Sequence, residues 1–356
     1  MSKWFEIKKS LVILAPMADY TDSPFTRTCR KVSGKDFVVF KEMVSSEAIV
    51  RGNEKTLKMC AFDKSERPIV IQIFGDKPEV MAKAARIIEA KFKPDGIDLN
   101  MGCPVPKIAQ KSGAGAALMR NPTLASAIVK SVKKAVKLPV SVKTRLGWNS
   151  KEEILEFALI LEKAGADLIT IHGRTKTQGY SGTADWETIA EVKKLVKIPF
   201  IANGDIVDTM SAKKCLEITK ADGIMIGRGA LGNPWIFREI ARPACRQAGL
   251  QDCKIARLKK STKCHPREGG DPGKLDTGFP LGGGNDKKTP KEIVKIILKH
   301  AKLHEKHYGQ GSLVTFRKHL GFYFKGIPNI KELRAALMQI KEYKELENIL
   351  KEYLKK

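Results

Sequence analysis

A thiol on a turn is the first candidate for chemistry in this sequence. Cys103 stands between a glycine and a proline, three residues after the amide of Asn100 and directly past the strand-like run Gly96–Leu99. Loops at the carboxyl ends of strands carry the reactive side chains of α/β barrels. A thiol with an ordinary pKa of about 8.5 is protonated at neutral pH and can act as an acid. We interpret Cys103 as a candidate acid; a loop that merely contains a cysteine is the alternative.

Basic side chains gather at the carboxyl ends of two further strand-like runs. Residues two apart share one face of a strand, so Lys143 and Arg145 point the same way, as do His172 and Arg174 on the next run. Charges that point into a barrel are costly unless a ligand or a partner compensates them. A single inward lysine would be unremarkable, but this pairing on adjacent strands predicts an anionic ligand.

Two glycine-containing turns follow the last two strand-like runs. They read Asn203-Gly204-Asp205 and Gly227-Arg228-Gly229, and a short extra helix is expected from Trp235. Glycines let backbone N–H groups approach a phosphate, and the arginine adds positive charge. Barrels commonly bind phosphate at these two loops, completed by such a helix. The pattern predicts a phosphate site, with ordinary tight turns as the alternative.

Two earlier stretches could contact a flat ligand. Pro16, Met17 and Ala18 present backbone and a soft thioether after the first strand-like run. Gln72, near the end of the third run, can donate and accept hydrogen bonds at once, which suits a heterocycle. A satisfied amide in the core is the alternative interpretation of Gln72.

These residues need a scaffold of alternating strands and helices. Eight strand-like apolar runs recur, and helical patterns such as Pro78–Lys91 and Pro122–Val136 lie between most of them. Strand and helix in units of about 30 residues indicate parallel βαβ units, and eight units predict a (β/α)8 TIM barrel. A doubly wound open sheet is the alternative, but its usual glycine-rich first turn is missing from residues 11–22. The predicted strands are Leu11–Ala15, Phe37–Phe40, Ile69–Ile73, Gly96–Leu99, Pro139–Lys143, Leu168–His172, Pro199–Ala202 and Gly223–Ile226.

Composition limits the setting of the protein. Hydrophobic residues make up 42% and charged residues 29% of the 356 residues, as in ordinary globular proteins. No apolar run approaches the roughly 20 residues that a membrane span needs. The seven cysteines are scattered and form no Cys-x-x-Cys pair, so neither a disulfide framework nor a metal site is predicted. We expect a cytoplasmic protein without a membrane or metal partner.

The charge is unusual. The chain has 65 lysines and arginines against 39 aspartates and glutamates, a formal net charge of +26. Such an excess favours a polyanionic partner, and nucleic acid is the natural candidate. Lysines substituted freely on exposed helix faces are the alternative.

The chain divides into three parts by pattern. We expect a catalytic barrel over residues 1–245, an irregular glycine- and proline-rich insertion or linker over 246–289, and a basic helical domain over 290–356. Residues 291–356 carry 15 lysines and arginines against 7 glutamates, a net +8. A helical lid with solvated lysine faces is the alternative for this last part.

Taken together, these motifs resemble the tRNA-dihydrouridine synthases, particularly the bacterial B-type subfamily. The match rests on the motifs around Pro16, Gln72, Cys103, Lys143 and His172, on both glycine turns, and on the later Phe316-Arg317-Lys318-His319. One departure is Asp19-Tyr20, where the family usually has glycine and a small apolar residue.

The resemblance implies FMN as cofactor, NADPH or NADH as electron donor and tRNA as partner. It implies reduction of the C5–C6 double bond of specific uridines, with Cys103 as proton donor. We also expect the protein to act as a monomer. The implied FMN contacts are Pro16, Met17, Ala18, Gln72, Lys143, His172, Asn203, Gly204, Asp205, Gly227 and Arg228. The implied contacts to uracil or tRNA are Asn100, Arg145, Arg174 and Lys176.

Two other functions remain alternatives at this point. One is a flavin barrel that acts on free pyrimidines, like the dihydroorotate dehydrogenases; the basic helical part disfavours it. The other is a non-catalytic RNA-binding protein on a retired barrel. Cys103, Lys143 and the predicted phosphate loops disfavour that second function.

Overall fold

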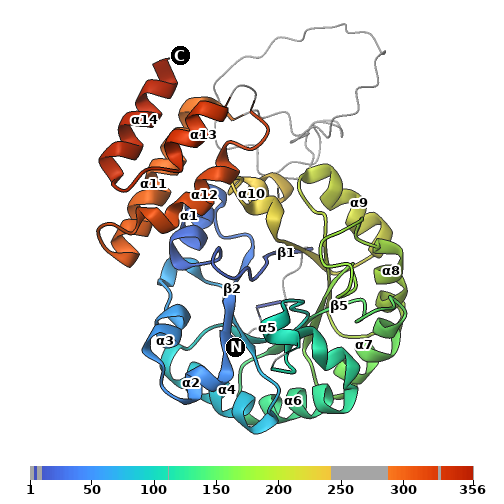
Figure 1. Ribbon diagram of the computed structural model, residues 1–356. Helices are drawn as coiled ribbons and strands as arrows, with labels where there is room; N and C mark the ends of the chain where they lie inside the picture. Colours follow the sequence, from blue (N-terminus) through green and yellow to red (C-terminus); the bar gives the residue numbers. More distant parts are fainter. Residues whose placement is uncertain (1–3, 6–9, 111, 242–287, 328–329, 356) are drawn as a thin grey trace, which may run out of the picture.

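The computed structural model describes residues 4–5, 10–110, 112–241, 288–327 and 330–355, and they contain a closed barrel of eight parallel strands (Figure 1). The first and last strands pair through Leu11–Gly223 and Leu14–Ile226, which closes the ring. The predicted barrel is therefore confirmed, and the open doubly wound sheet was the wrong alternative. The strands are β1 Leu11–Leu14, β2 Val38–Ser45, β3 Ile69–Phe74, β4 Gly96–Met101, β5 Val140–Arg145, β6 Leu168–His172, β7 Phe200–Asn203 and β8 Gly223–Ile226.

One strand differs clearly from its prediction. We expected a strand over Phe37–Phe40, but β2 continues to Ser45. The extension was not predicted because the charged residues Lys41 and Glu42 interrupt the apolar run. In the structure both residues are buried. The pairing of β2 with β3 also shifts its register between Lys41 and Val44, as a bulge does.

Helices cover the outside of the barrel, and polar caps and prolines mark where several begin. Asp22, Asn121, Asp185 and Asp208 accept backbone hydrogen bonds at helix N-termini. The helices are α1 Ser23–Ser33, α2 Ser46–Val50, α3 Glu54–Cys60, α4 Pro78–Phe92, α5 Pro106–Ala109, α6 Pro122–Ala135, α7 Glu153–Lys163, α8 Trp186–Leu195, α9 Thr209–Thr219 and α10 Ile236–Ala241. Short 3-10 helices span Lys64–Glu66, Gly115–Arg120 and Arg228–Ala230.

The alternation of side chains along the strands separates two cores. Outward-pointing residues such as Val142 and Ile171 pack between strands and helices. Inward-pointing residues such as Val70 and Leu168 fill the amino-terminal end of the barrel interior. Further along the same strands the interior turns polar, as with Gln72, which confirms that polar groups collect at the carboxyl end.

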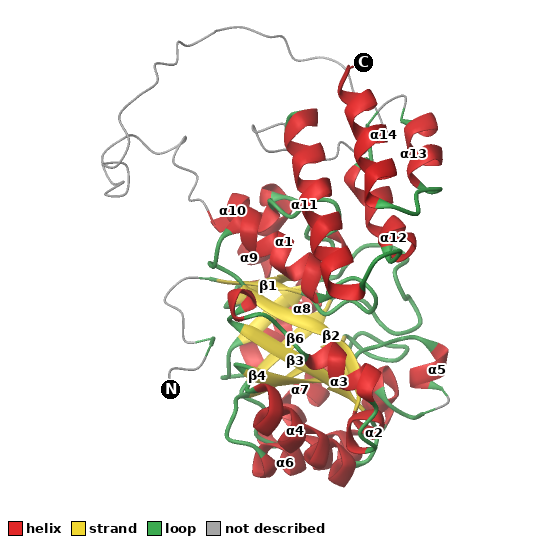
Figure 2. Cartoon of the chain, turned by 90° about the vertical axis from the view of Figure 1, so that its left-hand side faces the viewer, coloured by secondary structure: helices red, strands yellow, loops and turns green. Residues whose placement is uncertain are grey.

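The C-terminal helices pack beside the barrel around a hydrophobic core of their own (Figures 1 and 2). They are α11 Pro290–Tyr308, α12 Leu313–Tyr323, α13 Lys331–Leu337 and α14 Tyr343–Lys355. Helix α11 lies against α1 of the barrel. The loop after β8 also approaches α12 so closely that a Cβ on Gly232 would lie 2.3 Å from the backbone of Phe322.

The predicted division into 1–245, 246–289 and 290–356 stays a prediction, because residues 242–287 lie outside the described part of the chain. Among the described residues, no helix combines the length and apolar character that crossing a membrane requires.

Candidate active site at the carboxyl end of the barrel

The turn that carries Cys103 is held from two sides. From below, the Asn100 side-chain oxygen accepts the backbone N–H groups of Gly102, at 3.2 Å, and Cys103, at 2.9 Å. From the neighbouring strand, Arg145 Nε donates to the carbonyl of Gly102 at 2.8 Å. A Cβ on Gly102 would lie 3.0 Å from the backbone of Thr144, so glycine permits this close approach. The thiol therefore occupies a fixed position at the end of β4.

The surroundings of Cys103 keep its thiol protonated. The residue is 9% exposed and contacts Ile108 and Ala114. Burial raises the pKa of the Cys103 thiol, and the backbone of Val105 and the nearby charge of Arg145 offset only part of that rise. A neutral thiol is the form that a proton donor needs at neutral pH.

A chain of buried polar side chains runs beneath this turn. Asn100 donates to Gln72 at 2.8 Å, Gln72 donates to Asp98 at 2.6 Å, and Ser141 donates to the other oxygen of Asp98 at 2.6 Å. Burial raises the pKa of Asp98 to about 6, and these two hydrogen bonds lower it again in part. Sequence reasoning missed Asp98, although it shares a strand face with Asn100 and is charged inside an apolar run.

Positive charge dominates the barrel mouth above this chain. We call the group of Lys143, Arg145, His172, Arg174 and Arg228 the cationic mouth. Lys143 is half-buried, and its ammonium group has no hydrogen-bond or ion-pair partner among the described residues. Burial, followed by the charge of Arg145, lowers the pKa of Lys143 to about 8. Burial and the neighbouring cations hold the pKa of His172 well below its usual range, so this imidazole is neutral.

Two arginines of the cationic mouth are held inside the protein. Arg145 donates to the carbonyls of Gly102, Thr175 and Gly179, and Arg174 differs from it in pairing with a carboxylate. Arg174 is 2% exposed and pairs with both carboxylate oxygens of Asp205, at 2.9 and 2.7 Å. It also donates to the carbonyls of Ser181 and Gly182. The structure thus shows Arg174 bracing two loops from inside, and its predicted contact with tRNA stays a prediction.

The two glycine turns meet beside these arginines. Asn203 donates to the carbonyl of Met225 at 2.7 Å, which ties β7 to β8. Gly204 and Asp205 both have positive φ, 121° and 55°, and a Cβ on Gly204 would lie 2.7 Å from that of Ala184. The Asp205 carboxylate pairs with Arg174 and would repel an anion. The backbone N–H groups of this turn are therefore the part that can contact one.

The first loop lies next to the last one. A Cβ on Gly227 would have ordinary contacts, at 3.7 Å, with Ala15 and the Met17 sulfur, so the two loops border one space. Pro16 and Met17 are half-buried and Ala18 is exposed. Asp19 has φ of 67°, in the left-handed region, which explains why a glycine suits this position and why aspartate is tolerated.

Aromatic rings complete the rim of the site. Tyr180 is 60% exposed, and the guanidinium of Arg228 lies 4.6 Å and that of Arg145 5.6 Å from the centre of its ring. Lys176 lies over the ring of Trp148 at 4.3 Å. The predicted contact of Lys176 with tRNA stays a prediction. Tyr180 was not among the predicted site residues, because a tyrosine in a polar loop carries no signal until its neighbours are known.

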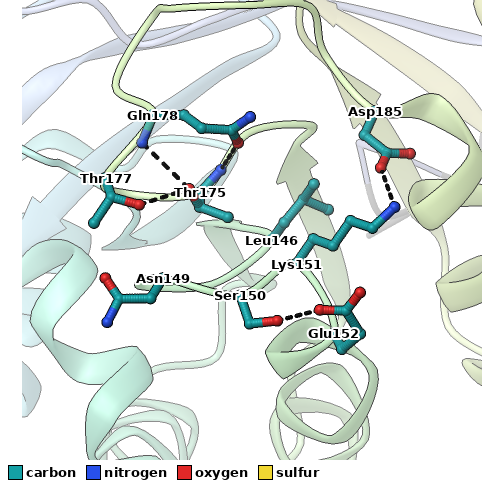
Figure 3. A pocket seen from close by; sticks show the side chains of 9 residues that line it. All are labelled: Leu146, Asn149, Ser150, Lys151, Glu152, Thr175, Thr177, Gln178 and Asp185. Atoms are coloured by element: carbon teal, nitrogen blue, oxygen red, sulfur yellow. Dashed lines mark hydrogen bonds and ion pairs between the residues drawn. The ribbon is translucent and has the colours of Figure 1, made fainter.

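A separate pocket opens beside the mouth, on the loops that follow β5 and β6 (Figure 3). Its volume is about 370 Å3, and an ion pair of 2.8 Å between Lys151 and Asp185 crosses one side. None of the predicted site residues lines it, so it adjoins the site without forming part of it. Its walls are Leu146, Asn149, Ser150, Lys151, Glu152, Thr175, Thr177, Gln178 and Asp185.

Fold and geometry together define a (β/α)8 barrel with a protonated thiol and an excess of positive charge at its catalytic end. The sequence model of the dihydrouridine synthase (Dus) family matches residues 13–266. The chain belongs to this family and is one of its oxidoreductases, which confirms the resemblance seen in the sequence.

Named relatives match across most of the chain. A probable tRNA-dihydrouridine synthase 1 of Synechocystis sp. is 38% identical over 96% of this chain and 85% of that protein. A probable tRNA-dihydrouridine synthase of Aquifex aeolicus is 43% identical over 69% of this chain and 77% of that protein. The tRNA-dihydrouridine synthase B of Pasteurella multocida is 35% identical over 95% of this chain and 90% of that protein.

Solved structures give more distant likenesses. Histamine dehydrogenase from Rhizobium sp. 4-9 is 14% identical with a TM-score of 0.49, and the alignment covers 67% of this chain and 48% of that one. A variant of NCR from Zymomonas mobilis is 16% identical with a TM-score of 0.46, over 68% and 91% of the two chains. Likenesses this low bear on neither cofactor nor substrate.

Proposed function

We propose that this protein reduces the C5–C6 double bond of specific uridines in tRNA to 5,6-dihydrouridine, with FMN as cofactor and NADPH or NADH as electron donor. The observation that carries the proposal is that one barrel mouth holds both a protonated Cys103 and a Lys143 ammonium without a partner among the described residues. We also retain the predictions of a cytoplasmic protein that acts as a monomer.

The residues at the mouth fit FMN. Two cations would supply positive charge for an anionic group. The ammonium of Lys143 has no partner in the part of the chain that the structure describes, and the half-exposed guanidinium of Arg228 lies 3.6 Å from Asp205. The turns at Gly204 and Gly227 leave backbone at the ends of β7 and β8, where a phosphate is expected. Pro16–Ala18 and Gln72 would contact the ring system. When bound and reduced, FMN supplies a hydride for C6 of the uracil.

Cys103 would complete the reduction. Addition of a hydride at C6 leaves an electron pair at C5, which takes the thiol proton to form the second C–H bond and a thiolate. Arg145 and Lys143 stabilise the negative charge that develops on sulfur, since both lower the pKa of Cys103. The thiolate then recovers a proton from solvent, so atoms and charge balance over the cycle.

The positions of Asn100 and Arg145 support a revised account of their roles. Both use hydrogen bonds to fix the turn of Cys103, so we propose that they orient the acid in addition to any contact with the base. Arg174 orients Asp205 in the same manner. Lys176 and Tyr180 lie on the rim and are the better candidates for contact with tRNA.

A uridine must leave its stack to reach the barrel mouth, so we expect base extrusion. The helical part, with its net charge of +8 over residues 291–356, would hold the phosphate backbone. This binding is electrostatic, and its affinity should fall steeply as salt rises.

The direct test is mass spectrometry of unmodified tRNA after incubation with protein, FMN and NADPH. A mass gain of two hydrogens at defined uridines would support the proposal and give the position. FMN binding and NADPH oxidation without any gain would favour a free pyrimidine such as orotate, to be assayed in parallel. Protein that binds tRNA but takes up no FMN would favour the non-catalytic alternative.

A further inference from the structure

Four ionisable side chains meet where the C-terminal helices pack on the barrel. Asp22 caps α1, His300 and His304 lie on α11, and His319 lies on α12. One ligand atom from each of Asp22, His300 and His319 lies within 4.8 Å of the others. His304 lies outside that group of three, with Nδ1 3.9 Å from Asp22 Oδ2, and the hydroxyl of Tyr308 donates to the same Oδ2 at 3.1 Å. We call these four residues the histidine cluster; all of them are buried.

Three imidazole nitrogens of the histidine cluster lack partners. His300 Nε2, His304 Nδ1 and His319 Nε2 are buried without a hydrogen bond to any residue that the structure describes. An unsatisfied buried polar atom costs free energy, and three in one place call for an explanation. A bound ion that accepts the lone pairs of these nitrogens provides one.

The opposite ring nitrogens are supported as they are in metal sites. His300 Nδ1 lies 3.0 Å from the hydroxyl of Tyr323, and His304 Nε2 lies 2.8 Å from the hydroxyl of Thr315. Metal-binding histidines usually donate their second N–H to such an oxygen, which fixes the ring and its tautomer.

Charge also favours a cation here. Asp22 brings a carboxylate that is 3% exposed, and His300 and His319 each bring a ring nitrogen that has no hydrogen bond among the described residues. Lys318 is the nearby opposing charge, and it lies over the ring of Tyr20.

We propose that Asp22, His300, His304 and His319 bind one Zn2+ ion that fastens the C-terminal helices to the barrel. Nitrogen and carboxylate ligands in a closed set of four are typical of structural zinc. His300 and His304 are four residues apart on one helix, a spacing that puts two histidines on one face. Zinc–nitrogen bonds of about 2.0–2.1 Å bring ligands to roughly 3.3 Å from one another, so the side chains must close in on the ion.

The sequence analysis predicted no metal, so the proposed zinc site departs from that prediction. That prediction rested on the missing Cys-x-x-Cys pairs, whereas the proposed ligands come from segments almost 300 residues apart. They come together where α1 packs against α11 (Figure 2) and where the ring of Phe25, on α1, stacks on that of His319, on α12.

The test is the metal content of the full chain, purified without a histidine tag or chelator from cells supplied with zinc. We expect about one zinc per chain by plasma mass spectrometry, and visible absorption bands after replacement by Co2+. Wild-type protein with no bound zinc and no Co2+ spectrum would overturn the proposal. An iron-loaded protein would overturn the choice of zinc.

Variants separate the histidine cluster from adventitious binding. His300→Gln and His319→Gln should lose the metal, while His307→Gln, on the exposed part of the same helix, should keep it. A chelator should lower the Tm of wild type and of His307→Gln to the same extent. Retention of zinc by both cluster variants would place the ion elsewhere and refute the assignment, even if either variant is less stable.

Discussion

The cationic mouth and the histidine cluster both withdraw ionisable side chains from water, but they differ in the charge that remains. At the mouth, the carboxylate of Asp205 faces Arg174 and Arg228, and Asp98 lies beneath Lys143. The ammonium of Lys143 has no hydrogen-bond or ion-pair partner among the described residues. In the histidine cluster the imidazoles are neutral and the charged group at pH 7 is the carboxylate of Asp22. The first region is therefore suited to an anion and the second to a cation.

The difference shows how burial alone fails to define a site. In both regions, burial is the largest cause of the pKa shifts, yet it leaves Lys143 charged at pH 7 and the histidines uncharged. What distinguishes the two regions is which lone pairs and N–H groups stay unpaired. Experiments that load each region with ligands of opposite charge can test this directly.

The largest expected effect concerns the acid at the mouth. Replacement Cys103→Ala removes the proton donor, and loss of general acid catalysis typically costs 10²–10⁴-fold, so we expect dihydrouridine formation to fall by at least about a hundredfold. Uptake of FMN and oxidation of NADPH should persist, since the thiol contributes to neither. Cys215→Ala, which alters another buried cysteine on α9, should retain product formation. Near-normal product from Cys103→Ala would remove this residue as the acid.

The second effect tests the sign of the charge at the mouth. Lys143→Ala and Arg228→Ala each delete a cation that we assign to FMN, and hydrogen bonds to charged groups contribute about 1.5–3 kcal/mol. We expect FMN affinity to weaken by roughly ten- to a hundredfold in equilibrium dialysis. The exposed Lys134→Ala, on the outer face of α6, is the matched control. Equal flavin occupancy in all three variants would contradict the assignment.

A pH series sharpens the same point. Because the pKa of Lys143 is lowered to about 8, its charge is complete below that pH and is lost above it. FMN affinity should therefore weaken as pH rises from 7 to 9, by up to about tenfold for one lost proton. His172, already neutral, should not contribute in this window. Lys143→Arg keeps its charge at these pH values, so its affinity should stay level; a parallel decline would assign the effect to another group.

The barrel and much of its mouth could be predicted because their signals are local. Alternation along β5 puts Val142 outside and Lys143 inside, and a period of two shows this without any tertiary information. The glycine turns after β7 and β8 are likewise continuous in sequence. In parallel barrels the order of the strands then fixes which loops are neighbours.

The remaining features depend on contacts between distant segments. The pairing of Arg174 with Asp205 joins two loops, and sequence reasoning assigned each residue separately to a ligand. Asp98 was not predicted as a site residue because it lies within an apolar run, and its hydrogen bond with Gln72 is visible only in the folded structure. The histidine cluster joins Asp22 to residues near 300 and 319, and no spacing rule connects them.

The smallest expected effect tests the cation–π contacts between Tyr180 and two arginines of the cationic mouth. Tyr180 provides an exposed ring beside Arg228 and Arg145, whereas the histidine cluster is fixed by buried contacts. An exposed cation–π contact is worth about 0.5–1 kcal/mol, so Tyr180→Leu should raise the KM for tRNA roughly two- to fivefold and leave kcat nearly unchanged. Tyr180→Phe keeps the ring and should behave as wild type, because the contact uses the ring face and not the hydroxyl. If Tyr180→Phe raises the KM for tRNA as much as Tyr180→Leu does, the hydroxyl contacts the substrate. Tyr180 would then recognise tRNA by a hydrogen bond, and not by holding Arg228 and Arg145 in place.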